Sequence, residues 1–237
     1  MAAAQVKNEK NRNNDELAMR EKLNDFLQKN RLKFIAILGI LVVILIGFII
    51  GTSVMGKIQA GALSKIDGFN TRYQDLKKYI GSTDSDAASK QADIDALLND
   101  LGAFTAKSSG FAAARAYAIS ANILMDEKKW PDAEKAWSSS AKAASKSYLA
   151  PISTFNAAVA AEEQGNIDEA ISLYNQSIAY VNSYTTAARA QFAIGRLEES
   201  RNNKDAALAA YKTIVSKWPS DAVWANLAQS RIVVLSE

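Results

Sequence analysis

Two pairs of adjacent glutamates are the side chains whose type and spacing could do acid–base chemistry. Glu162 precedes Glu163, and Glu198 precedes Glu199. A carboxyl group can transfer a proton when its surroundings tune its pKa. On a helix, however, adjacent side chains point about 100° apart, and carboxylates on a solvated helix surface are the usual case. The two pairs therefore do not predict a catalytic site.

The chain of 237 residues contains neither histidine nor cysteine. Their absence removes the Ser-His-Asp and Cys-His nucleophile systems, imidazole and thiolate metal ligands, and disulfides. The sequence also contains no glycine-rich phosphate loop, nucleophile elbow or calcium-binding loop. We therefore predict a protein that is not an enzyme, with no catalytic, cofactor-binding or metal-binding residues.

Charge is distributed unevenly along the chain. Residues 1–33 carry eight Lys or Arg against five Asp or Glu, whereas the residues after 51 carry twenty of each sign. A nucleic-acid-binding domain needs Lys and Arg concentrated on one face. The charge-balanced C-terminal part has no such excess, so we predict no nucleic-acid partner.

A hydrophobic run separates these two parts. Residues 34–50 read FIAILGILVVILIGFII without a charged residue, and weakly polar residues extend the run to 55. About 20 helical residues match a bilayer core of about 30 Å, so we predict a transmembrane helix over 34–55. One alternative is a buried helix of a soluble domain. Another is a cleavable signal peptide with its A-x-A site at 60–62, but the long charged segment before the run favours a retained anchor.

Flanking charges predict the orientation of this anchor. Five cations (Arg20, Lys22, Lys29, Arg31 and Lys33) precede the run closely, and two (Lys57 and Lys65) follow it at a similar distance. The positive-inside rule then places a basic tail, residues 1–33, in the cytosol and the larger part outside. Gly47 and Gly51 form a G-x-x-x-G pair that favours close approach of a second helix and hence a homodimer, although chance explains the pair equally well.

The second half repeats a pattern of small and aromatic residues every 37 positions. A small residue on one helix lets an antiparallel helix approach closely, and the aromatic ring fills the groove beside it. The sequence therefore predicts an all-α fold built from helical hairpins. In order within each copy, the small, small and aromatic residues are Ala121, Ala133 and Trp137; Ala158, Ala170 and Tyr174; and Gly195, Ala207 and Tyr211.

The turns inside these hairpins are predicted at Lys128, Gly165 and Asn202. Glycine and asparagine tolerate the left-handed backbone that often ends a helix. Each second helix is expected to begin with an acid, because side-chain capping and the helix dipole both favour one there. These acids are Asp132, Asp168 and Asp205.

These residues resemble the tetratricopeptide repeat family, whose hairpins carry the same small, small and aromatic positions. The resemblance covers about residues 111–237 and includes Pro219, where the family often ends a second helix. It implies repeats at about 111–147, 148–184 and 185–219, followed by a capping helix at 220–236. Two departures are the period, about 34 in the family, and the absence of an aromatic near Leu124, Ala161 and Glu198. Residues 56–110 are expected to form a helical stalk or a degenerate first repeat.

The resemblance also implies a concave groove that binds peptides. Phe155 and Phe192 are expected either to anchor an apolar peptide or to pack between repeats, and the polar positions are expected to be solvated. Three of them match the carboxylate clamp of some family members, but Ala118 and Ala193 stand where that clamp has cations. The implied groove residues are Arg115, Asn122, Ile152, Phe155, Asn156, Val159, Arg189, Phe192 and Arg196.

The order of tail, anchor and repeats is similar to that of bacterial inner-membrane tetratricopeptide proteins of the YfgM type, which accompany the Sec translocon and periplasmic chaperones. This likeness implies a scaffold or adaptor whose periplasmic domain binds other proteins, the translocon or chaperones among them. The alternative is a structural component of a larger envelope assembly, such as outer-membrane protein assembly, cell division or a flagellar-motor collar.

Overall fold

The computed structural model describes residues 2–80, 85–180 and 187–237, and within these ranges the chain is helical without a strand. This confirms the all-α prediction. The helices are α1 (Ala2–Leu76), the 3-10 helix η1 (Lys77–Tyr79), α2 (Ser85–Thr105), α3 (Gly110–Asp126), α4 (Trp130–Ala143), α5 (Leu149–Glu163), α6 (Ile167–Ile178), α7 (Ala187–Ser200), α8 (Lys204–Lys217) and α9 (Ala222–Ser236).

The chain divides into two compact units, Met1–Ile58 and Gln59–Glu237. The first is the N-terminal part of α1. Between Ile35 and Ile50 its large apolar side chains are 46–69% exposed. Among the residues described, no single helix meets the length and hydropathy expected of a membrane span. The segments Met19–Lys33 and Ile35–Ile50, bent by 54°, meet it as a pair.

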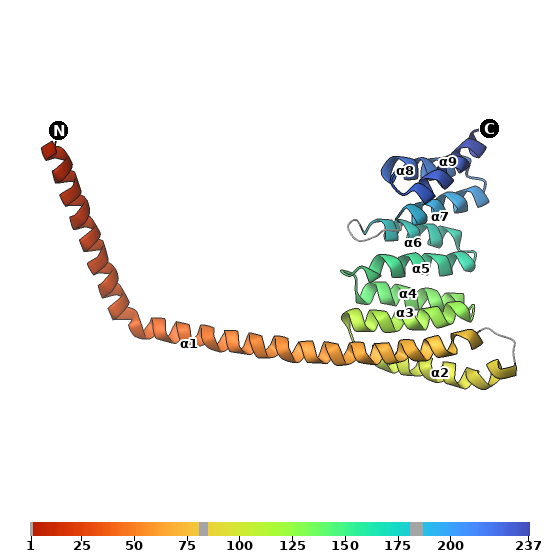
Figure 1. Ribbon diagram of the computed structural model, residues 1–237, viewed down its shortest axis with the longest axis horizontal. Helices are drawn as coiled ribbons and strands as arrows, with labels where there is room; N and C mark the ends of the chain where they lie inside the picture. Colours follow the sequence, from red (N-terminus) through yellow and green to blue (C-terminus); the bar gives the residue numbers. More distant parts are fainter. Residues whose placement is uncertain (1, 81–84, 181–186) are drawn as a thin grey trace. The chain divides into compact units, whose positions relative to one another are not determined.

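From α3 onward, three helical hairpins and a final helix are stacked in the second unit (Figure 1). α3 pairs with α4, α5 with α6, and α7 with α8, while α9 packs on α8 and α7. Each hairpin also packs on the next through α4 and α5 or through α6 and α7. Because every helix contacts its neighbours along the chain, the core consists of successive hydrophobic clusters that are rich in alanine and aromatic residues.

The turn of each hairpin has the left-handed backbone expected from the sequence. The φ angles are 59° at Lys128, 77° at Gly165 and 62° at Asn202. In each turn the next amide donates to a carbonyl five residues earlier, as from Asn166 to Ala161 at 3.0 Å. This hydrogen bond is that of the Schellman motif, which satisfies carbonyls at the helix end. Lysine has no special tolerance for this conformation, so the motif imposes it on Lys128.

The acids expected to begin the second helices lie in their first turns, two or three residues after the capping positions. Asp132, Asp168 and Asp205 are first-turn residues of α4, α6 and α8. The capping positions belong to Lys129, Asn166 and Asn203, and none makes a side-chain capping hydrogen bond. The prediction of side-chain capping was therefore wrong, and these carboxylates stabilise the helices through the positive end of the helix dipole.

Residues 59–105 extend the stack at its beginning. Ile66 and Tyr73 near the end of α1 share a hydrophobic cluster with Leu97 of α2 and Ile119 of α3. The Tyr73 hydroxyl donates to the Asp126 carboxylate at 2.8 Å. The end of α1 and α2 thus form a further hairpin packed on α3. Positions 81–84, in its predicted break, and 184–185, the predicted boundary between two repeats, lie outside the described residues.

Candidate functional site

The repeat-defining residues form the core of the hairpins. Each alanine of the set is fully buried, and each aromatic ring is at most 4% exposed. The small side chains let paired helices close, and the rings occupy the space between them. The residues found in these positions are Ala121, Ala133, Trp137, Ala158, Ala170, Tyr174, Ala207 and Tyr211.

Gly195 permits a close approach between α7 and the Tyr211 ring of α8. A Cβ atom at this position would lie 2.6 Å from the ring carbon Cε1 of Tyr211. A contact of that length does not occur between real atoms, so the third hairpin needs glycine where the first two have Ala121 and Ala158. Pro219 follows the end of α8 and is exposed, as expected of a residue that cannot continue a helix.

The two groove phenylalanines pack between repeats. Phe155 is 7% exposed, with its ring centroid 5.1 Å from that of Tyr174. The guanidinium of Arg189, from the next hairpin, lies 4.8 Å from the same ring. Phe192 lies 5.1 Å from Tyr211 and 5.3 Å from Trp224. Of the two roles expected for these rings, packing accounts for their positions.

Polar groove candidates make contacts where solvation was expected. Arg196 Nη2 donates to Glu162 Oε1 at 2.5 Å, and Arg115 Nη2 donates to Asp67 Oδ1 at 3.1 Å. Ile152 is 41% exposed and Arg189 is exposed, while Asn122, Asn156 and Val159 are half-buried. We call the partly accessible set the first-helix surface, which consists of Arg115, Asn122, Ile152, Asn156, Val159, Arg189 and Arg196.

A hydrogen-bonded latch joins the second hairpin to the third. The Tyr174 hydroxyl donates to Glu162 Oε2 at 3.1 Å, and Arg196 of α7 donates to the other oxygen of the same carboxylate. Burial, reinforced by the Glu162 charge, raises the pKa of Tyr174. The phenol therefore stays protonated and keeps donating. The latch thus connects both helices of one hairpin to the first helix of the next.

The same arrangement recurs one repeat later. The Tyr211 hydroxyl donates to Glu199 Oε2 at 2.7 Å, and the Arg231 guanidinium of α9 donates to both oxygens of Glu199. Burial alone raises the pKa of the Glu199 carboxyl, but the hydrogen bonds from Arg231 and Tyr211 outweigh it and lower the pKa. α9 is thereby joined to the third hairpin as α7 is joined to the second.

These contacts correct the reading of the glutamate pairs as solvated carboxylates for three of the four residues, whereas Glu163 is exposed as expected. The side chains of Glu162, Glu198 and Glu199 are 20%, 8% and 15% exposed. Glu198 accepts hydrogen bonds from Arg201 and Asn203. Each of these three carboxylates accepts hydrogen bonds from other side chains of the fold. The recurrence of glutamate every 37 residues, at 162 and 199, was the available sequence signal.

The first interface uses apolar residues in the same places. Trp137 stands in the aromatic position, Met125 in that of Glu162 and Val159 in that of Arg196, each 37 residues earlier. Met125 and Val159 pack against the cluster that contains Trp137. The indole nitrogen of Trp137 is buried without a hydrogen-bond partner. The contact between successive hairpins is therefore apolar at the first interface and hydrogen-bonded at the second. We call the first the apolar latch and the second the polar latch.

Comparisons with known proteins agree with this repeated geometry. The family model described as tetratricopeptide repeat matches residues 120–184 and 179–222. A TPR repeat-containing protein of Treponema pallidum (strain Nichols) is 32% identical over 213 residues, which cover 84% of this chain and 88% of that protein. The chain belongs to the tetratricopeptide repeat family. Tetratricopeptide proteins are helical solenoids that generally act as scaffolds for protein–protein interactions, without catalytic activity of their own.

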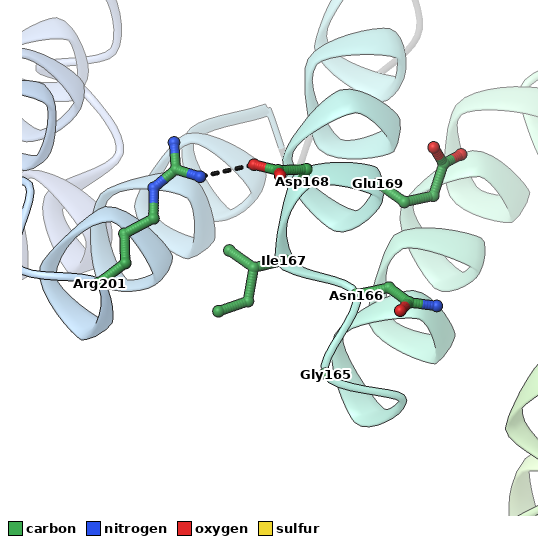
Figure 2. A pocket seen from close by; sticks show the side chains of 6 residues that line it. All are labelled: Gly165, Asn166, Ile167, Asp168, Glu169 and Arg201. Atoms are coloured by element: carbon green, nitrogen blue, oxygen red, sulfur yellow. Dashed lines mark hydrogen bonds and ion pairs between the residues drawn. The ribbon is translucent and has the colours of Figure 1, made fainter.

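Outside the first-helix surface, an open depression lies at a turn of the second tetratricopeptide hairpin. Its volume is about 610 Å³, and it is lined by residues 165–169 and Arg201. Figure 2 shows the Arg201 side chain reaching across to Asp168, whose Oδ1 accepts its hydrogen bond at 2.6 Å. This ion pair joins the first turn of α6 to the residue that follows α7 across the depression.

No cluster of three or more acidic residues that could hold a metal ion occurs in the part of the chain that the structure describes. Amides, guanidinium groups and apolar side chains on α3, α5 and α7 can contact another polypeptide by hydrogen bonding and burial.

Proposed function

We propose that this tetratricopeptide protein is a membrane-anchored scaffold that holds a segment of another protein on its first-helix surface. The observation that carries the proposal is the stack of three hairpins, which brings Arg115, Ile152 and Arg189 to corresponding positions on successive first helices. Repetition of one position along a solenoid favours an elongated ligand, because each hairpin can contact one part of it.

The chemistry of the first-helix surface suggests what that segment contains. Ile152, an exposed apolar side chain, stands between the corresponding positions of two arginines. The amides of Asn122 and Asn156 can each donate to a peptide carbonyl and accept from a peptide N–H. We therefore infer an extended segment with an apolar residue flanked by acidic ones. Because Ala118 and Ala193 replace two cations of the carboxylate clamp, a free C-terminus is not required.

The anchor is proposed from the hydrophobic run. Residues 34–50 carry no charge, and the large apolar side chains between Ile35 and Ile50 are exposed around the helix. An apolar surface of that extent is uncommon on a protein surrounded by water and is suited to lipid. With the cationic residues 20–33 before it, the run would place the N-terminus in the cytosol and residues 56–237 outside, in the bacterial inner membrane.

The partner proposed is an envelope protein, with the Sec translocon and periplasmic chaperones as the first candidates by analogy with YfgM-type proteins. Tethering the first-helix surface beside the bilayer would raise the effective concentration of such partners. Purification in mild detergent separates this role from that of a structural component. An adaptor recovers several partners below equal stoichiometry, whereas a structural component recovers one assembly in fixed ratio.

Site-specific photocrosslinking of the full chain in a bacterial host tests the binding surface. A photoreactive residue at Ile152 or Arg189 is expected to crosslink to partner proteins. The control position is Gln176, which is exposed on the second helix α6. Equal crosslinking from Gln176 and Ile152 would show that partners do not select the first-helix surface.

Topology is tested separately. Protease added to the outer side of the inner membrane is expected to digest residues beyond 56 while leaving the basic tail intact, and sodium carbonate washing should leave the protein in the membrane. Extraction by carbonate would reject the anchor without affecting the crosslinking result.

A further inference from the structure

Four apolar side chains of α1 lie on one face of the helix just before the hydrophobic run. They are 45–74% exposed and comprise Met19, Leu23, Phe26 and Leu27. At about 100° per residue, this spacing places them within an arc of about 100°. Asn30 lies in the same arc, and its amide Nδ2 donates to the Phe26 carbonyl at 2.9 Å, which meets part of its hydrogen-bonding capacity within the helix. We call the face formed by the four apolar residues the α1 stripe.

The charged residues of this segment are sorted around the α1 stripe. Cations lie beyond both of its edges, whereas the two acids, Glu21 and Asp25, lie on the opposite face with Leu32. All of these side chains are exposed. The cations are Arg20 and Arg31 beyond one edge and Lys22, Lys29 and Lys33 beyond the other. A helix that lies on an anionic lipid surface requires this order, with apolar groups in the acyl boundary, cations at the phosphates and acids in water.

We propose that the α1 stripe lies on the bilayer surface and holds Met19–Lys33 along the anionic cytosolic leaflet. This inference rests on the proposed anchor, which begins directly after the segment. Met19–Lys33 and Ile35–Ile50 are bent by 54° relative to each other. The bend turns the first segment more than half of the way from the direction of the span towards the membrane plane, and a span tilt of about 20° can supply much of the remainder.

A second copy of the chain fits the α1 stripe less well than lipid does. Because cations border both edges, pairing two stripes in either direction would bring cations of one copy beside cations of the other, and like charges so placed destabilise a contact. A protein partner would need two rows of acids on either side of an apolar ridge. The anionic bilayer presents phosphate groups along both edges at once and lies within reach of the residue that follows Lys33.

The balance of charge determines how the contact depends on the membrane. The segment carries five cations against two acids, so it is attracted to an anionic leaflet. A Lys or Arg beside such a surface strengthens binding about fivefold. Because the anchor already holds the segment beside the bilayer, the contact is intramolecular and does not depend on protein concentration. Its population should rise with the fraction of anionic lipid and fall with salt.

Spin labels on the full chain in lipid vesicles test the orientation of the segment. The protein has no cysteine, so one introduced thiol is labelled alone. In equal parts of phosphatidylglycerol and phosphatidylcholine, a label on Leu23→Cys is expected to collide mainly with lipid-soluble oxygen and one on Gln28→Cys mainly with a water-soluble nickel complex. The two oxygen-to-nickel accessibility ratios should differ at least about threefold. A label on Ile44→Cys reports the anchor and should meet oxygen.

A charge substitution tests the role of the anionic lipid. The fraction of phosphatidylglycerol is varied, and its midpoint for lipid exposure of the Leu23→Cys label is measured. Lys22→Gln removes a cation at the edge of the α1 stripe and is expected to move the midpoint to a higher fraction, since the contact weakens about fivefold at a fixed composition. Gln28→Glu is the control. It changes the net charge by the same amount on the face turned to water, so the midpoint should move less.

Several results would overturn the proposal, and they separate it from the anchor. If the Ile44→Cys label meets lipid while the Leu23→Cys and Gln28→Cys labels are equally accessible to nickel, the anchor stands and the segment projects into water. Broadening of the Leu23→Cys spectrum that disappears on dilution with unlabelled chains would indicate a contact between two copies. Equal lipid exposure in phosphatidylcholine alone would contradict the role of charge. An Ile44→Cys label in water would reject the anchor and the surface contact that rests on it.

Discussion

The interface between the first two hairpins and the interface between the next two use the same positions with opposite chemistry. At the first, Trp137, Met125 and Val159 belong to one apolar cluster. At the second, Tyr174, Glu162 and Arg196 are joined by hydrogen bonds. Both interfaces sit over fully buried alanines in their own hairpins. The hairpin geometry therefore requires small residues and a ring, but it leaves the chemistry of the contact between hairpins open.

The difference has an energetic meaning. A buried polar latch contributes only if each member keeps its partner, because an orphaned charge costs more than the hydrogen bond contributes. An apolar latch has no such requirement and responds mainly to lost volume. The second and third interfaces should accordingly be sensitive to pH and to single polar substitutions, whereas the first should be sensitive to cavities.

Removing the ring of the apolar latch is expected to have the largest effect. Trp137 is 4% exposed, and Trp137→Ala should lower the free energy of unfolding by about 3 to 5 kcal/mol, because a large cavity replaces the indole. Urea unfolding of the full-length protein, followed by circular dichroism, measures this. Trp137→Phe is the control, since it keeps a ring and removes the unpartnered N–H. A loss in Trp137→Phe as great as in Trp137→Ala would contradict the volume argument.

Transplanting the polar latch tests whether the two chemistries are interchangeable. Met125→Glu alone should destabilise the protein by about 2 to 3 kcal/mol, because the carboxylate has no partner. Adding Val159→Arg supplies the guanidinium that Arg196 provides at the next interface and should recover about half of that loss. A double-mutant cycle including Val159→Arg alone gives the coupling. If the free-energy changes of the two single variants simply add in the double variant, the carboxylate at position 125 and the guanidinium at position 159 do not interact, and the polar latch cannot form at the first interface.

Acid should weaken the third interface through Glu199. Hydrogen bonds from Arg231 and Tyr211 lower the pKa of this carboxyl from its ordinary value of 4.5 despite its burial. The unfolded chain therefore binds the proton more readily, so this stabilisation is complete above 4.5 and is lost as the pH falls through the lower folded pKa. Glu199→Gln is expected to cost about 1 to 2 kcal/mol at pH 7 and to flatten the acid limb of the stability curve. If the free energy of unfolding of Glu199→Gln depends on pH in the acid range as that of the unsubstituted protein does, Glu199 does not contribute to the pH dependence.

Alkali should act on the tyrosines, with the smallest effect. Burial and the neighbouring carboxylates raise the pKa of Tyr174 and of Tyr211 above the ordinary value of 10.0. The folded state holds these protons more tightly, so stability is complete below pH 10 and falls as the pH rises above it. Tyr174→Phe should cost about 0.5 to 1 kcal/mol at pH 7 and reduce the alkaline loss. Tyr148→Phe, on an exposed side chain, is the matched control.

Much of the fold could be predicted because the repeat is a local pattern. One hairpin is defined by Ala158, Ala170 and Tyr174, which contact residues within about one repeat length. Gly165 indicates the turn between its two helices. The predicted capping by Asp132 was wrong because capping depends on a shift of two or three residues, and the exact end of a helix is not resolved by residue pattern alone. The role of Phe155 stayed open for a similar reason. Its burial depends on Arg189 and Tyr174, which belong to two different hairpins.

The sequence by itself determined the 37-residue period, the helical hairpins, the left-handed turns at Gly165 and Asn202, and the uncharged run at 34–50. These features follow from spacing, residue size and backbone preference, which act over short distances along the chain. Only the tertiary structure decided which carboxylates are latched. Arg231 and Glu199 are separated by 32 residues, and their pairing depends on how one hairpin stacks on the next. Stacking sets the burial of each group, and burial determines whether a charged or apolar side chain is an exposed surface or part of the core.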